Sequence, residues 1–394
     1  MMRFNFDTLI DRRGTDAVKL RQLKNLFGKE DLIPLWVADM EFETPPFIRE
    51  ALEERLKHPI YGYTMLPEDY WQTVINWQQY VHGWEIREEW LTFISGIVKG
   101  IGLALLHFTG KGDSVIIQPP VYHPFRKVIE NNGRVVLNNP LIWDGTRYHM
   151  DFDHLEDLLK RRRCPLLILA SPHNPGGCIW SRETLETLAK ICYKYNVTVV
   201  SDEIHADMPL YGNKHTPFTT VSQEAAQIGV VFNAPSKTFN IAGLVSSYAI
   251  VPNPQLRKGF YDFLSASDLN DATFVAAVAT RAAYTQGKEW HKQMLAYVQN
   301  NVDYVAEQLP RYIPLIRVPR PDASFLVWLD GRELKNAGAE SVSGFFIESG
   351  LALNDGAMFG QGGEGFMRLN VGCPRVLLEK ALEQLYNRYR ELTS

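Results

Sequence analysis

Cysteine is scarce in this chain of 394 residues, which has four. Cys164, Cys178, Cys192 and Cys373 form no Cys-x-x-Cys pair. A chain of this length with so few, irregularly spaced cysteines does not build a disulfide framework. We therefore expect a protein of a reducing compartment, the cytoplasm, without disulfides and without a metal site.

Long apolar runs and an excess of charge of one sign are also missing. No stretch approaches the roughly 18 uninterrupted apolar residues of a membrane span, and charges at Asp11, Arg12 and Arg13 interrupt any signal peptide. The formal net charge is -4, and the one dense basic run, 160–163, closes an expected helix, where cations complement the helix dipole. These absences argue against a membrane protein and against a nucleic-acid partner.

The composition instead indicates a globular enzyme-sized chain, because 45% hydrophobic and 22% charged residues can bury a large core and a smaller one. Between about residues 95 and 252, short apolar runs alternate with helical patterns, which is typical of a parallel sheet covered by helices on both faces. The expected strands are 114–118, 134–137, 166–170, 197–201, 230–233 and 246–250. Because these runs are almost continuously apolar, we expect both of their faces to be buried.

Helices fit between and after these strands. We expect helices over 152–162 and from a Ser181 cap to about 195. After about residue 285 the order changes to helix 290–308, strand 325–329, helix 339–349, strand 366–371 and a final helix 374–392. The sequence thus predicts an α/β fold with a three-layer αβα large domain and a mostly parallel central sheet. Residues 51–285 are expected to form the large domain. The C-terminal part, 286–394, is expected to form a smaller α/β domain that the N-terminal segment, 1–50, joins.

Polar loops follow three of the expected strands. Asn174 lies in the sequence Ser-Pro-His-Asn-Pro-Gly-Gly, Asp202 ends the next strand, and Lys237 stands in a loop of small and hydroxyl residues, 233–243. Open α/β sheets build their ligand sites just past the carboxyl ends of the strands. We therefore expect these three side chains to meet at one edge of the sheet.

The ordered set of Asn-Pro-Gly at 174–176, Asp-Glu-Ile-His at 202–205, Ser236-Lys237 and a C-terminal Arg368 resembles the fold-type I pyridoxal phosphate enzymes, the aspartate aminotransferase superfamily. The resemblance covers essentially the whole chain. Within that superfamily, the segments 34–42, 61–63, 202–205 and 236–244 look like the cystathionine β-lyase branch of MalY and PatB carbon–sulfur lyases.

The resemblance implies roles for Lys237, Asp202 and Asn174 that their chemistry supports. The Lys237 amine would hold the cofactor as a Schiff base and, once released, remove the substrate Cα proton. Asp202 would keep the pyridine nitrogen protonated, and Asn174 would donate to the 3'-oxygen. Without the resemblance, Lys237 is compatible with a surface lysine, Asp202 with a strand-end cap and Asn174 with ordinary turn chemistry.

The cofactor phosphate is expected at the start of an apolar helix. Gly96, Ile97 and Val98 follow a strand-like stretch, so their backbone N–H groups and the helix dipole suit a phosphate. Ser236, next to the lysine, is expected to add a donor.

One position departs from the superfamily pattern. Many relatives have an arginine eight residues after the lysine that pairs with the phosphate, whereas this chain has Val245. In the resembling branch, Tyr61 reaches the phosphate from a second subunit. The resemblance therefore implies a homodimer with shared active sites.

Five further residues complete the expected site. The resemblance implies that Tyr122 stacks on the cofactor ring, that His205 contacts the cofactor, and that Arg368 binds the substrate carboxylate. Ala38 and Asp39 would lie near the carboxylate end of the substrate. Ordinary aromatic packing for Tyr122, a structural role for His205 and a salt bridge for Arg368 are the alternatives.

The expected reaction is α,β-elimination from a sulfur amino acid, L-cystathionine or L-cysteine and related thioethers, to a thiol, pyruvate and ammonia. An aminotransferase on the same scaffold is the first alternative, because Lys237, Asp202, Asn174 and Arg368 would serve both reactions. The residues at 36–42, His205 and Val245 favour the lyase. A regulatory binding partner is the second alternative, since some members of the resembling branch also bind a transcription factor.

Overall fold

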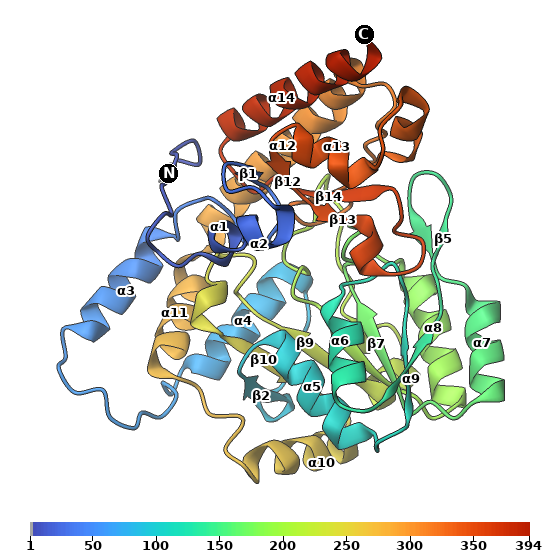
Figure 1. The fold of residues 1–394 in the computed structure, drawn as a ribbon. Helices are drawn as coiled ribbons and strands as arrows, with labels where there is room; N and C mark the ends of the chain where they lie inside the picture. Colours follow the sequence, from blue (N-terminus) through green and yellow to red (C-terminus); the bar gives the residue numbers. More distant parts are fainter. Residues whose placement is uncertain (1–2) are drawn as a thin grey trace.

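A seven-stranded sheet forms the centre of the computed structural model, which describes residues 3–394 (Figure 1). The strand order is β2-β10-β9-β8-β7-β3-β4. These strands are β2 Leu91–Ile94, β3 Ser114–Ile117, β4 Val135–Asn138, β7 Leu166–Ala170, β8 Thr198–Asp202, β9 Gly229–Asn233 and β10 Ser247–Ile250. Strands β3, β7 and β9 are buried at every position, which accounts for their continuous apolar runs.

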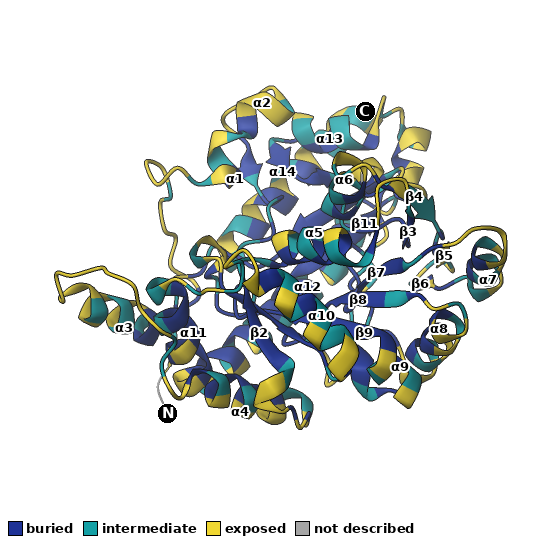
Figure 2. Ribbon diagram, turned by 90° about the horizontal axis from the view of Figure 1, so that it is seen from below, coloured by how far each residue is buried: buried dark blue, intermediate teal, exposed yellow. Residues whose placement is uncertain are grey.

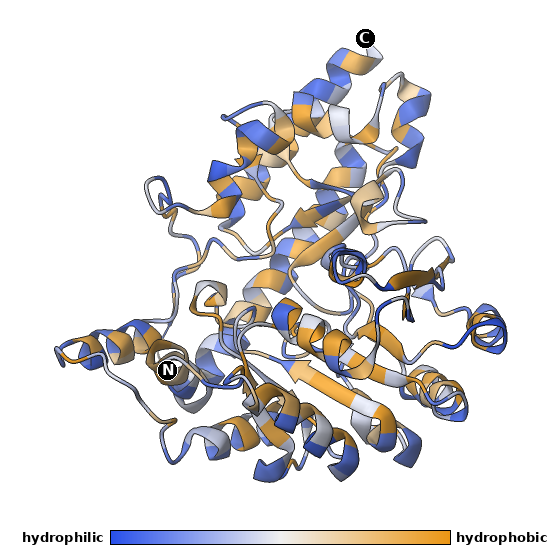
Figure 3. Ribbon diagram, turned by 60° about the horizontal axis from the view of Figure 1, so that its bottom comes forward, coloured by the Kyte–Doolittle hydropathy of each residue, from blue (hydrophilic) through white to orange (hydrophobic). Residues whose placement is uncertain are grey.

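Helices cover both faces of this sheet, and each face has its own hydrophobic core. On one face, Ile101 of α5 packs with Phe232 of β9. On the other, Leu188 of α8 and Trp77 of α4 belong to the same core as Val199 of β8. The helices turn their buried sides to the sheet and their exposed sides outward (Figure 2), and the strands between them are largely hydrophobic (Figure 3). The helices around the sheet are α4 Tyr70–His82, α5 Ile97–Phe108, α6 Pro124–Asn131, α7 Phe152–Arg161, α8 Arg182–Lys194, α9 Gln223–Ile228, α10 Pro254–Ser265 and α11 Phe274–Gln286.

The predicted three-layer αβα domain is therefore confirmed, with two corrections to its sheet. Strand β10 runs antiparallel to both β9 and β2. No full helix separates β9 from β10, and a parallel strand needs a crossover of that kind, so the chain returns in the opposite direction. Strand β4 is an edge strand with an exposed Val135, so the expectation that both faces of every strand are buried was wrong there.

A smaller α/β unit lies beside the sheet, built from the last third of the chain (Figure 1). Its three strands have the order β11-β14-β13. The N-terminal segment joins this unit through a parallel pair, in which Ile33 of β1 lies opposite Leu351 of β12. The elements of the unit are α12 Lys288–Tyr312, β11 Leu326–Asp330, α13 Val342–Glu348, β12 Leu351–Ala352, β13 Asn354–Asp355, β14 Phe366–Asn370 and α14 Arg375–Thr393, with β1 Ile33–Pro34, α1 Val18–Arg21 and α2 Leu23–Phe27 from the N-terminal segment.

The arrangement of two α/β units follows the predicted fold class, while the limits at residues 50 and 285 stay predictions. The first of these limits falls inside helix α3, Pro46–Leu56, which packs against α11 of the large unit. Helix α8 begins after Ser181, whose side chain accepts a hydrogen bond from the Thr184 backbone as a cap, as expected.

Within residues 3–394, no helix has the length and apolar character that crossing a membrane requires. The four cysteines lie within this part of the chain, and all are free and buried. The same residues contain no cluster of three or more His, Cys, Asp or Glu side chains placed to hold a metal ion.

Candidate active site

A cavity lies at the carboxyl ends of the parallel strands, where the loops of the large sheet meet the N-terminal segment. Most of the residues expected from the sequence line it. The lining residues are Ala38, Gly96, Ile97, Val98, Tyr122, Ala170, Pro172, Asn174, Asp202, Ile204, His205, Ser236, Lys237, Ala242, Val245 and Ser247.

The order of the strands explains why residues distant in the sequence meet here. Tyr122 follows β3, Asn174 follows β7, Asp202 is the last residue of β8, and Lys237 follows β9. Because these strands are parallel, their carboxyl ends share one edge of the sheet. Ser247 starts the antiparallel strand β10, so its amino end reaches the same edge.

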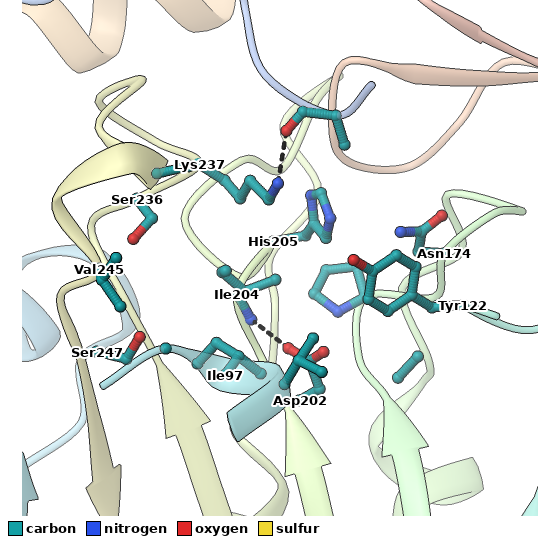
Figure 4. Close-up of a pocket in the computed structure, with 16 residues that line it drawn as sticks. Ile97, Tyr122, Asn174, Asp202, Ile204, His205, Ser236, Lys237, Val245 and Ser247 are labelled. Carbon is teal, nitrogen blue, oxygen red and sulfur yellow. Dashed lines mark hydrogen bonds between the residues drawn. The ribbon is translucent and has the colours of Figure 1, made fainter. Parts of the chain in front are cut away.

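Lys237 is partly buried, at the side of the cavity formed by the N-terminal segment (Figure 4). Its Nζ donates a hydrogen bond of 2.5 Å to the Ala38 carbonyl. Burial lowers the pKa of the Lys237 amine from its usual 10.5 to about 8. The amine therefore loses its proton at a lower pH than an exposed lysine does, which favours its use as a nucleophile or a base.

Asp202 is a buried carboxylate without a cation. Its Oδ1 accepts a hydrogen bond of 3.2 Å from the Ile204 backbone N–H. Burial raises the pKa of the carboxyl to about 7, and no cationic side chain among residues 3–394 forms an ion pair with it. A protonated ring nitrogen in the cavity would supply the missing positive charge.

Arg368 lies in strand β14 as a buried guanidinium without an anion. Its Nη1 donates to Asn174 Oδ1 at 2.9 Å, and its Nη2 donates to the Trp36 carbonyl at 3.0 Å and to Asn354 Oδ1 at 2.6 Å. Its Nε has no hydrogen-bond partner within the described residues, and burial lowers the pKa of the guanidinium to about 10. A substrate carboxylate would provide the negative charge that this group lacks.

The contact with Arg368 also orients Asn174. Because Asn174 Oδ1 accepts from the guanidinium, its amide N–H groups are left to donate elsewhere. Asn174 and Tyr122 lie together at one end of the view in Figure 4, opposite Ser236, Val245 and Ser247. This orientation suits an asparagine that donates to a phenolic oxygen.

The opposite end of the cavity is formed by the start of helix α5. Gly96 precedes the helix with a φ of 99°, a conformation that favours glycine, and Ile97 and Val98 are in its first turn. Their backbone N–H groups face no carbonyl of a preceding turn, so this end can bind an anion. The predicted phosphate location therefore lies on the cavity wall.

Neither Ser236 nor Val245 offers a free hydrogen-bond donor from its side chain at this end. Ser236 Oγ donates to the Ser246 carbonyl at 3.0 Å, so its proton is already engaged. Val245 has a φ of 54°, which is strained for a β-branched side chain, and it is 38% exposed. The lining of this end thus contains hydroxyl groups and helix N–H groups, and no arginine.

His205 and Tyr122 line the cavity where the sequence predicted them. His205 Nδ1 is 3.0 Å from Ser324 Oγ, and burial lowers the pKa of the imidazole to about 3, so the ring is neutral. Burial raises the pKa of the Tyr122 hydroxyl, so it stays protonated. Their contacts with a cofactor stay predictions.

Three predicted residues are not part of the cavity lining: Arg368, which binds the lining residue Asn174, and Asp39 and Tyr61. The Asp39 carboxylate forms ion pairs with Lys19 at 2.8 Å and Arg12 at 2.7 Å, while the neighbouring Ala38 lines the cavity. Tyr61 is 57% exposed, and its ring stacks on Phe274 with centroids 5.7 Å apart. Within this chain neither side chain reaches the site, and their roles toward substrate and cofactor stay predictions.

Sequence reasoning missed several lining residues. Ala170 and Pro172 lie within four residues of Asn174, and Ile204 precedes His205, so the loops were predicted but not each side chain. Ala242 and Ser247 come to the cavity because the chain turns back between β9 and β10. An antiparallel return was not expected, and nothing in the local sequence signalled it.

The residues present fit pyridoxal phosphate. A partly buried amine, a carboxylate lacking a cation, an amide whose N–H groups are left to donate and a helix start suited to an anion surround one cavity. These groups match the aldehyde, the ring nitrogen, the 3'-oxygen and the phosphate of this cofactor in chemical type.

Comparison with known proteins gives the same result. The family described as aminotransferase class I and II matches residues 30–385. The chain is 42% identical to the cystathionine β-lyase PatB of Bacillus subtilis, over 97% of this chain and 98% of PatB. It is 31% identical to the protein MalY of Escherichia coli, over 98% of this chain and 99% of MalY.

Solved structures agree with these sequences. Cystalysin from Treponema denticola, which contains pyridoxal 5'-phosphate, superposes with a TM-score of 0.93 at 32% identity, covering 99% of this chain and 100% of cystalysin. The pyridoxal-phosphate-bound C–S lyase from Staphylococcus hominis gives a TM-score of 0.91 at 33% identity, covering 98% of this chain and 99% of the lyase. The chain therefore belongs to the aminotransferase class I and II family, in the group that includes PatB and MalY.

Proposed function

We propose that this chain is a pyridoxal-phosphate-dependent carbon–sulfur lyase that acts on β-thio amino acids by α,β-elimination. The observation that carries the proposal is that one site holds a carboxylate and a guanidinium, each without a partner of opposite charge. The Asp202 carboxylate lacks a cation, the Arg368 guanidinium lacks an anion, and the Lys237 amine faces the cavity next to them. PatB is named a cystathionine β-lyase, and the Staphylococcus hominis structure is named a C–S lyase.

The charge and the position of each side chain indicate its role in the reaction. Pyridoxal phosphate, when bound, accepts the electron pair that the substrate Cα retains after losing its proton. Asp202 would hold the proton on the ring nitrogen of the bound cofactor, and Asn174 would donate to its 3'-oxygen. Arg368 binds the substrate carboxylate, and Lys237 takes the Cα proton.

L-Cystathionine is the favoured substrate, with L-cysteine and related thioethers as alternatives. The bond between Cβ and sulfur breaks, and its electron pair leaves with the sulfur as a thiolate. One molecule of water completes the balance, so cystathionine and water give homocysteine, pyruvate and ammonia. A thiolate is a stable leaving group, so the site needs no additional acid at the sulfur.

An aminotransferase would use the same Lys237, Asp202, Asn174 and Arg368. Its reaction requires a 2-oxo acid to restore the cofactor, whereas elimination does not. The neutral His205 and Val245 at positions where many aminotransferases have tyrosine and arginine favour the lyase.

A product assay separates the two reactions. Purified protein is incubated with cystathionine without any 2-oxo acid, and pyruvate and free thiol are followed together. We expect equal amounts of both products, formed continuously. Turnover that occurs only after a 2-oxo acid is added would contradict the lyase and support the aminotransferase.

The working enzyme is proposed to be a cytoplasmic homodimer with shared active sites. The segment after α3 extends away from the body of the chain (Figure 1), and Ile60, Tyr61, Tyr63 and Met65 in it are more than half exposed. Large apolar side chains gathered in this way mark a contact surface. Tyr61 is the residue proposed to reach the cofactor phosphate of the second subunit.

A further inference from the structure

Residues 36–42 form a strap beside the cavity, and the side chains of Lys237 and Arg368 both donate hydrogen bonds to its backbone. Lys237 donates to the Ala38 carbonyl at 2.5 Å, and Arg368 donates to the Trp36 carbonyl at 3.0 Å. The positions of the amine and of the guanidinium therefore depend on the same short stretch of backbone. Any movement of the strap would move the two groups together.

Two asparagines hold the strap from outside the cavity. Asn370 donates to the carbonyls of Val37 and Asp39, at 2.6 and 2.7 Å. Asn240 accepts from the Met40 N–H at 2.9 Å and donates back to the Met40 carbonyl at 2.9 Å. These contacts fix the backbone on both sides of Ala38.

A cluster of four charged side chains also holds the strap in place; its members are Arg12, Lys19, Asp39 and Glu41. Lys19 is 2% exposed, and its Nζ lies 2.8 Å from Asp39 Oδ1 and 2.6 Å from Glu41 Oε1. Arg12 binds the same two carboxylates, at 2.7 Å to Asp39 and 2.9 Å to Glu41. Two positive and two negative charges therefore balance within the cluster, in which Lys19 is buried and the other three side chains are partly exposed.

We propose that this cluster is a positioning device for the catalytic lysine: through Asp39, it fixes the Ala38 carbonyl that receives the hydrogen bond of Lys237. Asp39 and Lys19 thereby act on Lys237 without touching the substrate or the cofactor. The inference rests on the proposed function for the role of Lys237 itself. It gives a function to Asp39 and Lys19, which do not line the cavity.

The charges around Lys237 give the cluster a second effect on the amine. Burial lowers the pKa of Lys237 first of all, and the Asp39 carboxylate is the strongest of the charges that oppose this change. Asp202 also raises the pKa, while Arg368 and Lys19 lower it. The other titratable side chains that line the cavity, His205 and Tyr122, are held neutral by burial.

The test uses the visible absorption of the holoenzyme, which changes when the nitrogen of the cofactor-bound lysine gains or loses its proton. Asp39→Asn keeps the shape of the side chain and removes the anion, so we expect the midpoint of the titration to fall by about 0.5 pH unit or more. Lys19→Met removes a cation, so the midpoint should rise by a similar amount. Glu41→Gln is the matched control, because it also removes one anion and two ion pairs from the cluster. Its shift should be less than half that of Asp39→Asn.

Opposite shifts for Asp39→Asn and Lys19→Met support the proposal, since loss of structure would not move the midpoint in two directions. Equal midpoints in wild type and both variants would overturn it, as would a Glu41→Gln shift as large as that of Asp39→Asn. If one of the two variants does not fold, the sign of the other decides. A wild-type protein with no visible absorption would instead contradict the proposed function, so the two failures are distinguishable.

Discussion

At the scale of the residue, burial shifts the groups of the site toward their neutral forms. The pKa of Asp202 rises to about 7 and that of Lys237 falls to about 8, because neither charged form is well solvated in the cavity. A bound cofactor would reverse this for Asp202, since its protonated ring nitrogen stabilises the carboxylate. The site is thus arranged for a charged ligand rather than for its own stability.

The raised pKa of Asp202 predicts a pH-dependent stability of the cofactor-free protein. The folded carboxyl binds its proton more tightly than the unfolded one, so stability is lost as the pH rises from about 4 to about 7. We expect Asp202→Asn to gain roughly 1–4 kcal/mol relative to wild type between pH 5 and pH 8. Urea unfolding of both cofactor-free proteins at the two pH values measures this gain. The same difference at both pH values would show that the Asp202 pKa is not raised.

The sequence allowed some of these residues to be predicted and others not, for a physical reason. Lys237, Asp202 and Asn174 each follow a buried apolar strand, and the rule for parallel sheets brings the ends of such strands together. The direction of a side chain does not follow from that rule. The Asp39 carboxylate, for example, turns to Lys19 and Arg12, and its expected place near the substrate stays a prediction.

At the scale of the element, the strap at residues 36–42 connects the two units of the chain. It is bound by Asn240, which lies in the same loop as Lys237 in the large unit, and by Asn370 at the end of β14 in the small one. Asn240 has a φ of 55°, a left-handed conformation that asparagine tolerates better than most residues. Its side chain makes three hydrogen bonds to the strap, to the N–H and carbonyl of Met40 and to the Phe42 carbonyl.

Asn240→Ala should therefore lower the free energy of unfolding by about 2–4 kcal/mol, through three lost hydrogen bonds and a strained alanine. Because the strap holds Lys237 and Arg368, KM for the thio amino acid should rise as well. Asn132→Ala is the control: its amide makes one hydrogen bond, to the Val128 carbonyl, at the end of α6 opposite to Tyr122. Urea unfolding and steady-state kinetics compare the two. An unchanged KM in Asn240→Ala would show that the strap does not govern substrate binding.

The elements themselves were largely predictable, because buried strands and amphipathic helices leave clear patterns. The expected helix at 290–308 corresponds to α12, Lys288–Tyr312, and the strand at 366–371 to β14. The direction of β10 was not predictable, since a buried strand has the same apolar run whether it is parallel or antiparallel. That strand places Ser247 at the phosphate end of the cavity. Because the direction of β10 was predicted wrongly, Ser247 was not predicted as a residue of the site.

At the scale of the whole molecule, the described residues 3–394 place no arginine and no phenol of their own chain at the phosphate end of the cavity. Helix N–H groups and serine hydroxyls line that end beside Val245. The exposed apolar segment after α3 carries Tyr61 outward rather than toward the cavity of its own chain. Both features are explained together if two chains exchange their Tyr61 side chains.

Mixed dimers test this exchange. Tyr61→Phe should retain the cofactor more weakly, and Lys237→Ala should be inactive, so each homodimer loses activity. A dimer with one chain of each kind would contain one intact site and should recover up to about half of the wild-type rate. Activity is measured on isolated mixed dimers after subunit exchange. If the mixed dimers stay as inactive as the parents, Tyr61 does not act across subunits.

The central claim is that Lys237 both binds the cofactor and removes the Cα proton. It is tested most directly by following visible absorption and thiol release in wild type and Lys237→Ala after dialysis. We expect the variant to lose the absorption band and at least about 10³-fold of the rate of thiol release, because no other amine lines the cavity in the described part of the chain. A variant that retains the band and releases thiol at the wild-type rate would contradict the account.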